Sequence, residues 1–303
     1  MSLSSSPQIE PVAPDVVRSQ HAATKVYDKP FSYTPPKDSA LPLLFASPHS
    51  GTVYPDRMRA DLCVPLMDLR RTEDAFIEEL FAAAVPAGAG LLSARYARSF
   101  VDLNRDSLEL DRRMFDGLPP RPCGVPGPRV EAGLGCLPRV GAKGQPIYAV
   151  RMPSDEGERR LAGVHDAYHD HLSRELQTLK LRHGRAILID CHSMPSRQPG
   201  RRPLPDIVLG DRFGSSCSAR LTSLVERRFR KLGYSVARNT PYAGGFTTLR
   251  YGRPRRNIHA LQIEIRRDLY LDEAQVEKSS GFEQLGGDLS RLIDDVCVFA
   301  SGR

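Results

Sequence analysis

The chain has 303 residues, of which 40% are hydrophobic and 26% charged, a composition typical of a soluble globular protein. Its apolar runs fall short of the roughly 18 residues that a membrane helix needs, which excludes a membrane protein. The net charge is +7, but the basic residues are scattered and lack the aromatic platforms of a nucleic-acid-binding surface.

The first 20 residues are rich in Ser, contain Pro and have no apolar stretch of the signal-peptide kind. We therefore expect a flexible leader over residues 1–38, one globular domain over residues 39–303 and a cytoplasmic location. The six cysteines show no CxxC spacing, so neither a thiolate zinc site nor a disulfide framework is expected. The sequence leaves the oligomeric state open.

The hydrophobic pattern predicts strands and helices in alternation. Prolines bound a buried strand at residues 43–46, and apolar residues at helical spacing predict a helix over residues 66–84. Further strands are predicted at residues 91–94, 100–103, 186–189, 206–210, 234–237 and 261–265, and further helices at residues 154–183, 216–232 and 272–299. Continuous apolar strands between helices predict an α/β sheet covered on both faces.

A Pro- and Gly-rich stretch over residues 119–146 interrupts this pattern. A loop of this length inside a compact domain is usually functional. We expect it to be ordered and to cover the active site.

Histidines and carboxylates, the residue types that bind metal ions, lie at or near the ends of the predicted strands. His49 and His192 each follow an apolar run, Glu264 lies in a later strand, and the acidic pair Glu73-Asp74 lies between the first two in sequence. Ligands gather beyond the carboxyl ends of strands in open α/β sheets. Two histidines and one carboxylate form the usual ligand set of a hydrolytic zinc centre, and a further Glu can serve as its general base.

Other candidates are weaker. His165, His169 and His171 fall in a helix rich in charged residues, and we interpret them as part of a solvated face. Ser193 lacks the Gly-x-Ser-x-Gly motif of a serine nucleophile. Cys191 points to the opposite face of its strand from the adjacent histidine and cannot pair with it.

Two further segments are suited to binding a substrate. Asn104 and Arg105 place an amide beside a guanidinium, which suits a carboxylate or, equally, a turn with a salt bridge. The glycines of the loop at residues 244–248, among them Gly245, allow either close backbone approach to a ligand or a tight turn. The densest basic cluster follows this loop and favours an anionic substrate: Arg250, Arg253, Arg255 and Arg256.

Taken in order, these motifs resemble the N-formylglutamate amidohydrolase family. The matching segments are Ser47-Pro48-His49-Ser50-Gly51, Asp74 with Ile77 and Leu80-Phe81, Ala94-Arg95-Tyr96-x-Arg98, Val101-Asp102-Leu103-Asn104-Arg105, Asp190-x-His192-Ser193, Leu204-Pro205-Asp206, Leu209-Gly210, Gly244-Gly245, Tyr251-Gly252 and His259-Ala260-Leu261-Gln262-Ile263-Glu264. Each segment is short, but their joint order covers about residues 43–272.

The resemblance implies a three-layer α/β/α sandwich around a mixed, mostly parallel sheet, similar to zinc carboxypeptidases and acyl-amino-acid deacylases. It also implies one Zn²⁺ held by His49, His192 and a carboxylate, for which Asp74 matches the family position and Glu73 is the alternative. Glu264 falls on the general base.

The same resemblance implies that Asn104 and Arg105 hold the carboxylate of the substrate. We further expect Gly245 and Arg250 to bind the substrate and Arg98 to stabilise the oxyanion. The expected substrate is a small anionic N-acyl amino acid such as N-formyl-L-glutamate, with no nucleic-acid or membrane partner. A zinc peptidase acting on small peptides and a non-catalytic anion-binding module are the alternatives, and the particular acyl amino acid stays open.

Overall fold

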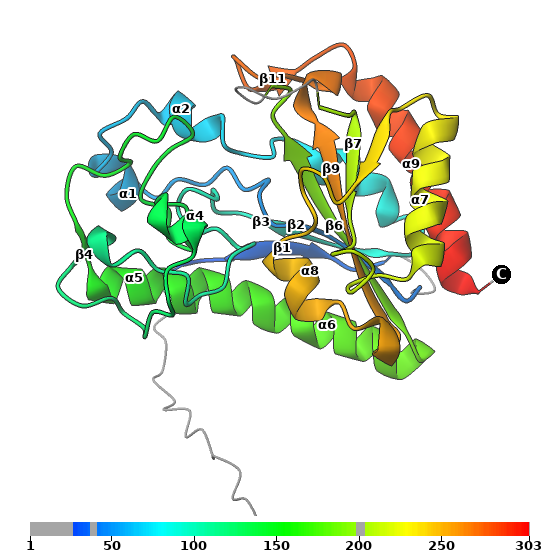
Figure 1. Cartoon of the computed structure of the whole chain (residues 1–303), viewed down its shortest axis with the longest axis horizontal. Helices are drawn as coiled ribbons and strands as arrows, with labels where there is room; N and C mark the ends of the chain where they lie inside the picture. The colour runs from blue at the N-terminus through cyan, green and yellow to red at the C-terminus, as the bar shows by residue number, and fades with distance from the viewer. Residues whose placement is uncertain (1–26, 37–40, 198–203, 303) are drawn as a thin grey trace, which may run out of the picture.

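A seven-stranded sheet with the order β1-β3-β2-β6-β9-β7-β8 forms the centre of the molecule (Figure 1). This computed structural model describes residues 27–36, 41–197 and 204–302, so most of the expected leader lies outside the described residues. The strands are β1 (Phe31–Thr34), β2 (Leu43–Ser47), β3 (Gly90–Ala94), β6 (Ala186–Met194), β7 (Ile207–Gly210), β8 (Val236–Arg238) and β9 (Ile258–Arg266). β3, β2, β6 and β9 are parallel, whereas β1 is antiparallel to β3 and β7 to β9.

Helices cover both faces of this sheet. α6 (Ala167–His183) packs on the face to which Leu44 and Leu188 point. α7 (Ala219–Lys231) and α9 (Phe282–Ser301) pack on the opposite face, against Phe45 and Ile189. Successive residues of a strand point to opposite faces, so β2 and β6 supply both cores. The result is the expected three-layer α/β/α architecture, with α6 on one side and α7 and α9 on the other in Figure 1.

Shorter elements build the remaining connections. They are α1 (Asp56–Ala60), α2 (Leu66–Arg70), α3 (Ile77–Leu80), α4 (Pro128–Glu131), α5 (Ser154–Arg160), α8 (Phe246–Tyr251), the small strands β4 (Phe115–Asp116), β5 (Met152–Pro153), β10 (Leu271–Asp272) and β11 (Glu277–Lys278), and 3₁₀ turns at Ala82–Ala84, Arg112–Met114, Pro254–Arg256 and Arg267–Leu269. The helix predicted over residues 154–183 is continuous, with a π-helical stretch at Leu161–Asp166 between α5 and α6. Among the described helices, none combines the length and the apolar character needed to span a bilayer.

The single helix predicted over residues 66–84 is wrong, because the chain breaks between α2 and α3. Phe76 adopts a left-handed conformation with φ of 61°. Arg267, distant in sequence, donates from Nη1 to the carbonyl of Arg71 at 2.9 Å. The N–H of Asp74 donates to the carbonyl of His49 at 3.0 Å. Tertiary partners thus satisfy backbone groups that a continuous helix would have paired internally.

Two other predicted elements differ. Residues 100–103 are buried, but they form turns and irregular backbone, and the N–H of Asp102 donates to the carbonyl of Cys136 and not to a strand. The terminal helix begins at Phe282 and not at residue 272, because the side chain of Asp272 accepts from the N–H groups of Ala274 and Gln275 and forms a turn. Apolar content alone does not separate these arrangements.

One strand, β1, was not predicted, and others, among them β6 and β9, extend beyond their predicted limits. β1 pairs with β3 through residues 31–34, so the folded part of the chain begins within the segment assigned to the flexible leader. β6 continues to Met194, which places His192 and Ser193 within the strand and not after it.

Candidate active site

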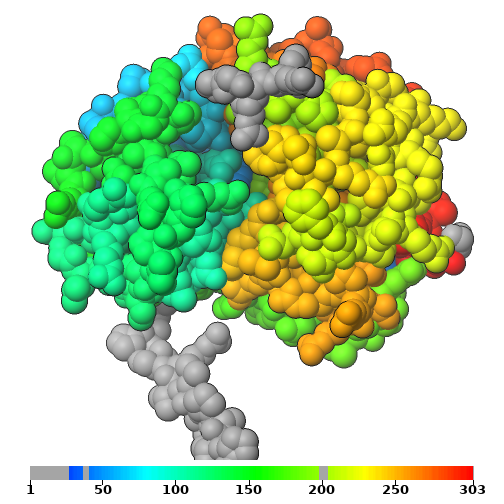
Figure 2. Space-filling model, viewed as in Figure 1, coloured from blue at the N-terminus to red at the C-terminus, as the bar shows by residue number. Residues whose placement is uncertain are grey.

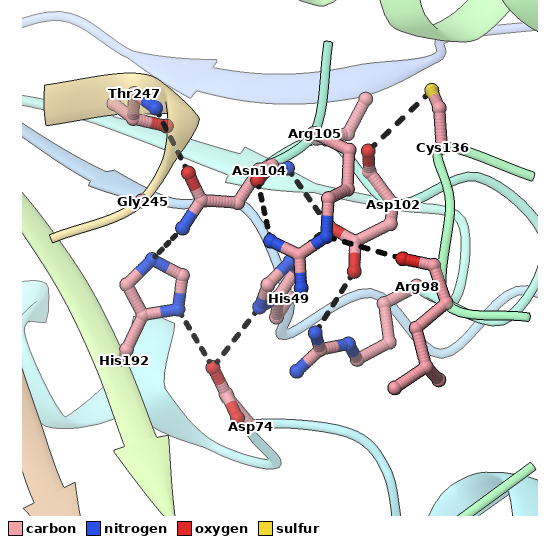
Figure 3. A network of polar contacts seen from close by, with 12 residues as sticks. His49, Asp74, Arg98, Asp102, Asn104, Arg105, Cys136, His192, Gly245 and Thr247 are labelled. Carbon is pink, nitrogen blue, oxygen red and sulfur yellow. Dashed lines mark hydrogen bonds and ion pairs between the residues drawn. The ribbon is translucent and has the colours of Figure 1, made fainter. Parts of the chain in front are cut away.

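Three ligand-type side chains converge at the carboxyl edge of the sheet. His49 follows β2, His192 lies near the end of β6, and Asp74 lies in the break between α2 and α3. One ligand atom from each lies within 4.8 Å of the others. Oδ2 of Asp74 is 3.4 Å from Nδ1 of His49 and 3.0 Å from Nδ1 of His192 (Figure 3). All three residues are buried.

The hydrogen bonds of the two imidazoles prepare this group for a cation. Nε2 of His49 donates to Oδ1 of Asp102 at 2.7 Å, which leaves the Nδ1 lone pair directed at the centre. Nδ1 of His49 is buried without a hydrogen-bond partner among the described residues, an unfavourable state unless a ligand occupies it. Nε2 of His192 lies 3.2 Å from Oδ1 of Asp190. Two imidazoles and one carboxylate therefore fit a divalent cation such as zinc.

Arg267, which the sequence analysis did not single out, orients Asp74 together with Ser193. Oδ1 of Asp74 accepts from Nη2 of Arg267 at 2.9 Å and from the hydroxyl of Ser193 at 3.1 Å, which leaves Oδ2 for the centre. Burial raises the pKa of Asp74, but the hydrogen bond from His192 and the charge of Arg267 outweigh it and hold the pKa well below its usual range. The position of Arg267 immediately after the strand that carries Glu264 was the only sequence signal for this contact.

The neighbouring Glu73 points elsewhere. Its Oε1 accepts from the hydroxyl of Tyr54 at 2.5 Å, and its Oε2 lies 3.9 Å from Nε of Arg70. The structure therefore places Asp74 and not Glu73 with the two histidines. Burial raises the pKa of Glu73 to about 7.

Glu264 lies on the strand next to His192. The parallel register of β6 and β9 pairs His192 with Glu264, so both side chains project from the same face of the sheet. Gln262 donates to Oε1 of Glu264 at 2.7 Å and accepts from the N–H of Gly245 at 2.8 Å. Burial raises the pKa of Glu264 to about 8. A carboxyl group with such a pKa can exchange protons near neutral pH.

Asn104 connects the centre to α8. Its Oδ1 accepts from the N–H of Thr247 at 2.9 Å, and its Nδ2 lies 3.1 Å from Nε2 of His192 (Figure 3). Because Oδ1 is committed to an N–H group, the amide nitrogen faces the histidine. Gly245 allows this approach, since a Cβ there would lie 2.3 Å from Nδ2 of Asn104.

Arg98 and Arg105 line a cavity of about 110 Å³ beside Asp102. Arg98 donates to Oδ2 of Asp102 at 2.9 Å. Arg105 donates to the carbonyls of Leu134 and Asn104 and forms no ion pair among the described residues. The long loop over residues 119–146 supplies part of the cavity wall: Leu134, Pro138, Val140, Gly141 and Ala142.

Comparisons with known proteins agree with this geometry. The sequence model of the N-formylglutamate amidohydrolase family matches residues 41–271. The N-formylglutamate deformylase of Pseudomonas aeruginosa is 35% identical over 244 residues, which cover 78% of this chain and 85% of that protein. The chain belongs to the N-formylglutamate amidohydrolase family.

Further relatives support the family and the fold. The N-formylglutamate deformylase of Pseudomonas putida is 33% identical over 242 residues, covering 78% of this chain and 84% of that protein. The crystal structure of the N-formylglutamate amidohydrolase from Ralstonia eutropha JMP134 superposes with a TM-score of 0.85 at 36% identity, covering 90% of this chain and 98% of that one. A gene product of Agrobacterium tumefaciens shares the fold alone, with a TM-score of 0.64, 17% identity and coverage of 91% and 97%.

The arginine cluster predicted to recognise substrate lies apart from the Arg98–Arg105 cavity of this family member. Arg250 lies over the rings of Phe246 and Tyr251, at 5.5 and 5.6 Å from their centroids. The other members line a cleft of about 730 Å³ that α8 also borders, together with Arg212: Arg253, Arg255 and Arg256. In the space-filling view, this part of the chain belongs to the yellow and orange surface (Figure 2).

The interpretation of His165 and His169 as a solvated face is wrong. Each is 1% exposed, and their ring centroids are 4.4 Å apart. Their spacing of four residues correctly placed them on one side of the helix, but the pattern did not reveal that polar partners in the loop around Asn104 cover that side.

Proposed function

We propose that this protein hydrolyses the N-formyl group of N-formyl-L-glutamate and requires a divalent cation, zinc being the expected one. The observation that carries the proposal is the convergence of His49, Asp74 and His192 at one point, with Glu264 on the adjacent strand. A cation at that point supplies Lewis acidity, which polarises the amide carbonyl and makes water a better nucleophile at neutral pH.

Glu264 is the proposed general base. It is buried, lies beside His192 in the sheet and is oriented by Gln262. It removes a proton from the attacking water as the C–O bond forms. It then delivers that proton to the departing amine, so that formate and free glutamate are the products.

Arg98 is the proposed oxyanion donor. Asp102 accepts a hydrogen bond from one of its nitrogens. This contact fixes the guanidinium and leaves other N–H groups available to a ligand. Such a preoriented cation stabilises the negative charge that develops on the formyl oxygen.

Asn104 and Arg105 are proposed to hold the substrate carboxylate. If His192 held a cation, its Nε2 would carry the proton, and Oδ1 of Asp190, 3.2 Å away, could accept it. The amide N–H groups of Asn104 are then free for a ligand. Burial lowers the pKa of Arg105, and its lack of a carboxylate partner among the described residues favours an anion in the adjoining cavity.

A substrate panel tests the proposal. N-formyl, N-acetyl and N-succinyl derivatives of glutamate, aspartate, alanine and leucine would be compared through kcat/KM. N-formyl-L-glutamate should exceed N-formyl-L-alanine by about 2 to 3 kcal/mol of transition-state stabilisation, the value of a charge-assisted hydrogen bond. Arg105→Ala should reduce this preference or lower activity on all acyl amino acids. Equal rates on acidic and apolar substrates would refute the specificity, and faster cleavage of dipeptides would favour a peptidase.

A further inference from the structure

Two buried histidines outside the metal centre lie against the loop that carries Asn104. His165 belongs to the π-helical stretch between α5 and α6, and His169 lies one turn later in α6. Their spacing places both rings on one side of the helix, where they are packed together. A π-helical turn is rare and often occurs near functional sites. None of the steps proposed above uses either ring.

Both rings bind backbone carbonyls that flank Asn104. Nε2 of His169 lies 2.9 Å from the carbonyl oxygen of Leu103, and Nε2 of His165 lies 2.9 Å from that of Arg105. A carbonyl oxygen only accepts, so each Nε2 carries a proton and donates it. The residue between these two carbonyls is therefore fixed on both sides.

The same rings contact α8, which supplies the second partner of Asn104. Phe246 packs edge-on against His169 at 5.3 Å between centroids, and the hydroxyl of Tyr251 lies 2.9 Å from Nδ1 of His169. Burial lowers the pKa of His169 well below its usual value. The hydroxyl of Tyr251 also donates to the backbone carbonyl of His169 at 3.1 Å, so its single proton lies between two acceptors of the same residue, Nδ1 and the carbonyl oxygen. Between Phe246 and Tyr251 lies Thr247, whose N–H binds Oδ1 of Asn104.

We propose that His165 and His169 are positioning residues that fix Asn104 for binding of the substrate carboxylate. The histidine pair holds the backbone on either side of Asn104 and, through α8, the N–H group that orients its amide. Recognition of a carboxylate requires such groups to be held within a fraction of an ångström. The identity of the ligand rests on the proposed function. That the two histidines hold the loop of Asn104 in place does not depend on it.

Hydrogen–deuterium exchange of the full-length protein tests the fixing itself, without any activity. His165→Leu and His169→Leu remove the donors, whereas His165→Gln and His169→Gln retain an N–H near Nε2. We expect exchange at the N–H groups of Asn104 and Thr247 to accelerate about tenfold in the Leu variants and to stay near wild type in the Gln variants.

His171→Leu is the matched control, because His171 lies on the same helix but packs against Phe31 and Tyr33. It should leave exchange around Asn104 unchanged. Should the Leu variants fail to fold, Tyr251→Phe removes only the hydroxyl bound to His169 and should accelerate exchange at Thr247. Unchanged exchange in the folded Leu variants, or in Tyr251→Phe when those do not fold, would overturn the proposal.

Kinetics on N-formyl-L-glutamate test the consequence for the substrate. The Leu variants should raise KM about tenfold, change kcat much less and retain the metal content of the wild type. In an Asn104→Ala background, His169→Leu should add no further change in KM, because both substitutions act through the same amide. Additive effects, or Gln variants as impaired as the Leu variants, would mean a merely structural role. An inactive wild type would refute the proposed function, while the exchange result would still decide the positioning role.

Discussion

Nε2 of His49 and Oδ1 of Asp102 are 2.7 Å apart, and this contact decides which nitrogen of His49 faces Asp74 and His192. Both side chains are buried. Burial raises the pKa of Asp102, but the charges of Arg98 and Arg105 and the hydrogen bond from His49 outweigh it and hold the pKa well below its usual range. Asp102 therefore stays ionised at neutral pH and keeps the proton of His49 on Nε2.

Asp102→Asn should weaken metal binding. An amide attracts the Nε2 proton less than a carboxylate does, and it can also donate to that nitrogen and reverse the tautomer. Loss of such a partner typically costs a factor of 10 to 100 in metal affinity. Competition with a coloured chelator measures it. Asp111→Asn is the control, since Asp111 is equally buried but binds Arg113 and Arg139. Equal affinities for both variants would contradict the role of Asp102.

The purified protein should contain about one divalent metal ion per chain. Elemental analysis of protein that was purified without any chelator measures this content. His192→Ala should lose both metal and activity, because two ligands do not hold the ion. Removal of the metal should abolish turnover, and zinc should restore it. Full activity of metal-free protein would exclude a catalytic metal.

Glu264→Gln should separate chemistry from metal binding. The amide keeps the shape of the side chain but cannot accept a proton, so kcat should fall by about a thousandfold or more. The metal content should not change, because Glu264 is outside the group formed by His49, Asp74 and His192. Glu283→Gln is the control, an exposed residue at the start of α9. If Glu264→Gln retains normal turnover, another group is the base.

Gly245→Ala should disturb the site through Asn104. The new Cβ would lie 2.3 Å from Nδ2 and 2.5 Å from Oδ1 of Asn104, so the amide must move away from His192 and Thr247. We expect kcat/KM to fall at least about tenfold, as for other small displacements of positioning groups.

Gly287→Ala provides the matched control for that substitution. Gly287 lies in α9 and has no atom within 4 Å of an added Cβ. Alanine there should raise the free energy of unfolding by about 0.5 to 1 kcal/mol and leave kcat/KM unchanged. Denaturant titration and steady-state kinetics on the two variants distinguish the effects. Normal kcat/KM in Gly245→Ala would show that the position of Asn104 matters little.

The sequence by itself determined the layers of the fold. Apolar runs such as residues 43–46 and 186–189 are short, continuous and bounded by turn residues, because both faces of a central strand are buried. Local pattern also placed His49 and His192 at one edge, since parallel strands end on the same side. The order of short motifs along the chain identified the family before any geometry was known.

Only the tertiary structure decided the details of the site. Residues 66–84 have helical periodicity, yet Arg267 binds carbonyls at the break and holds Asp74 at the centre. His165 and His169 have a spacing that suits a solvated face, yet the loop of Asn104 covers them. These contacts join residues far apart in sequence. Helix propensity amounts to fractions of a kcal/mol per residue, whereas a buried polar group without a hydrogen-bond partner costs several times more. Contacts with residues far away in sequence therefore decide the local conformation.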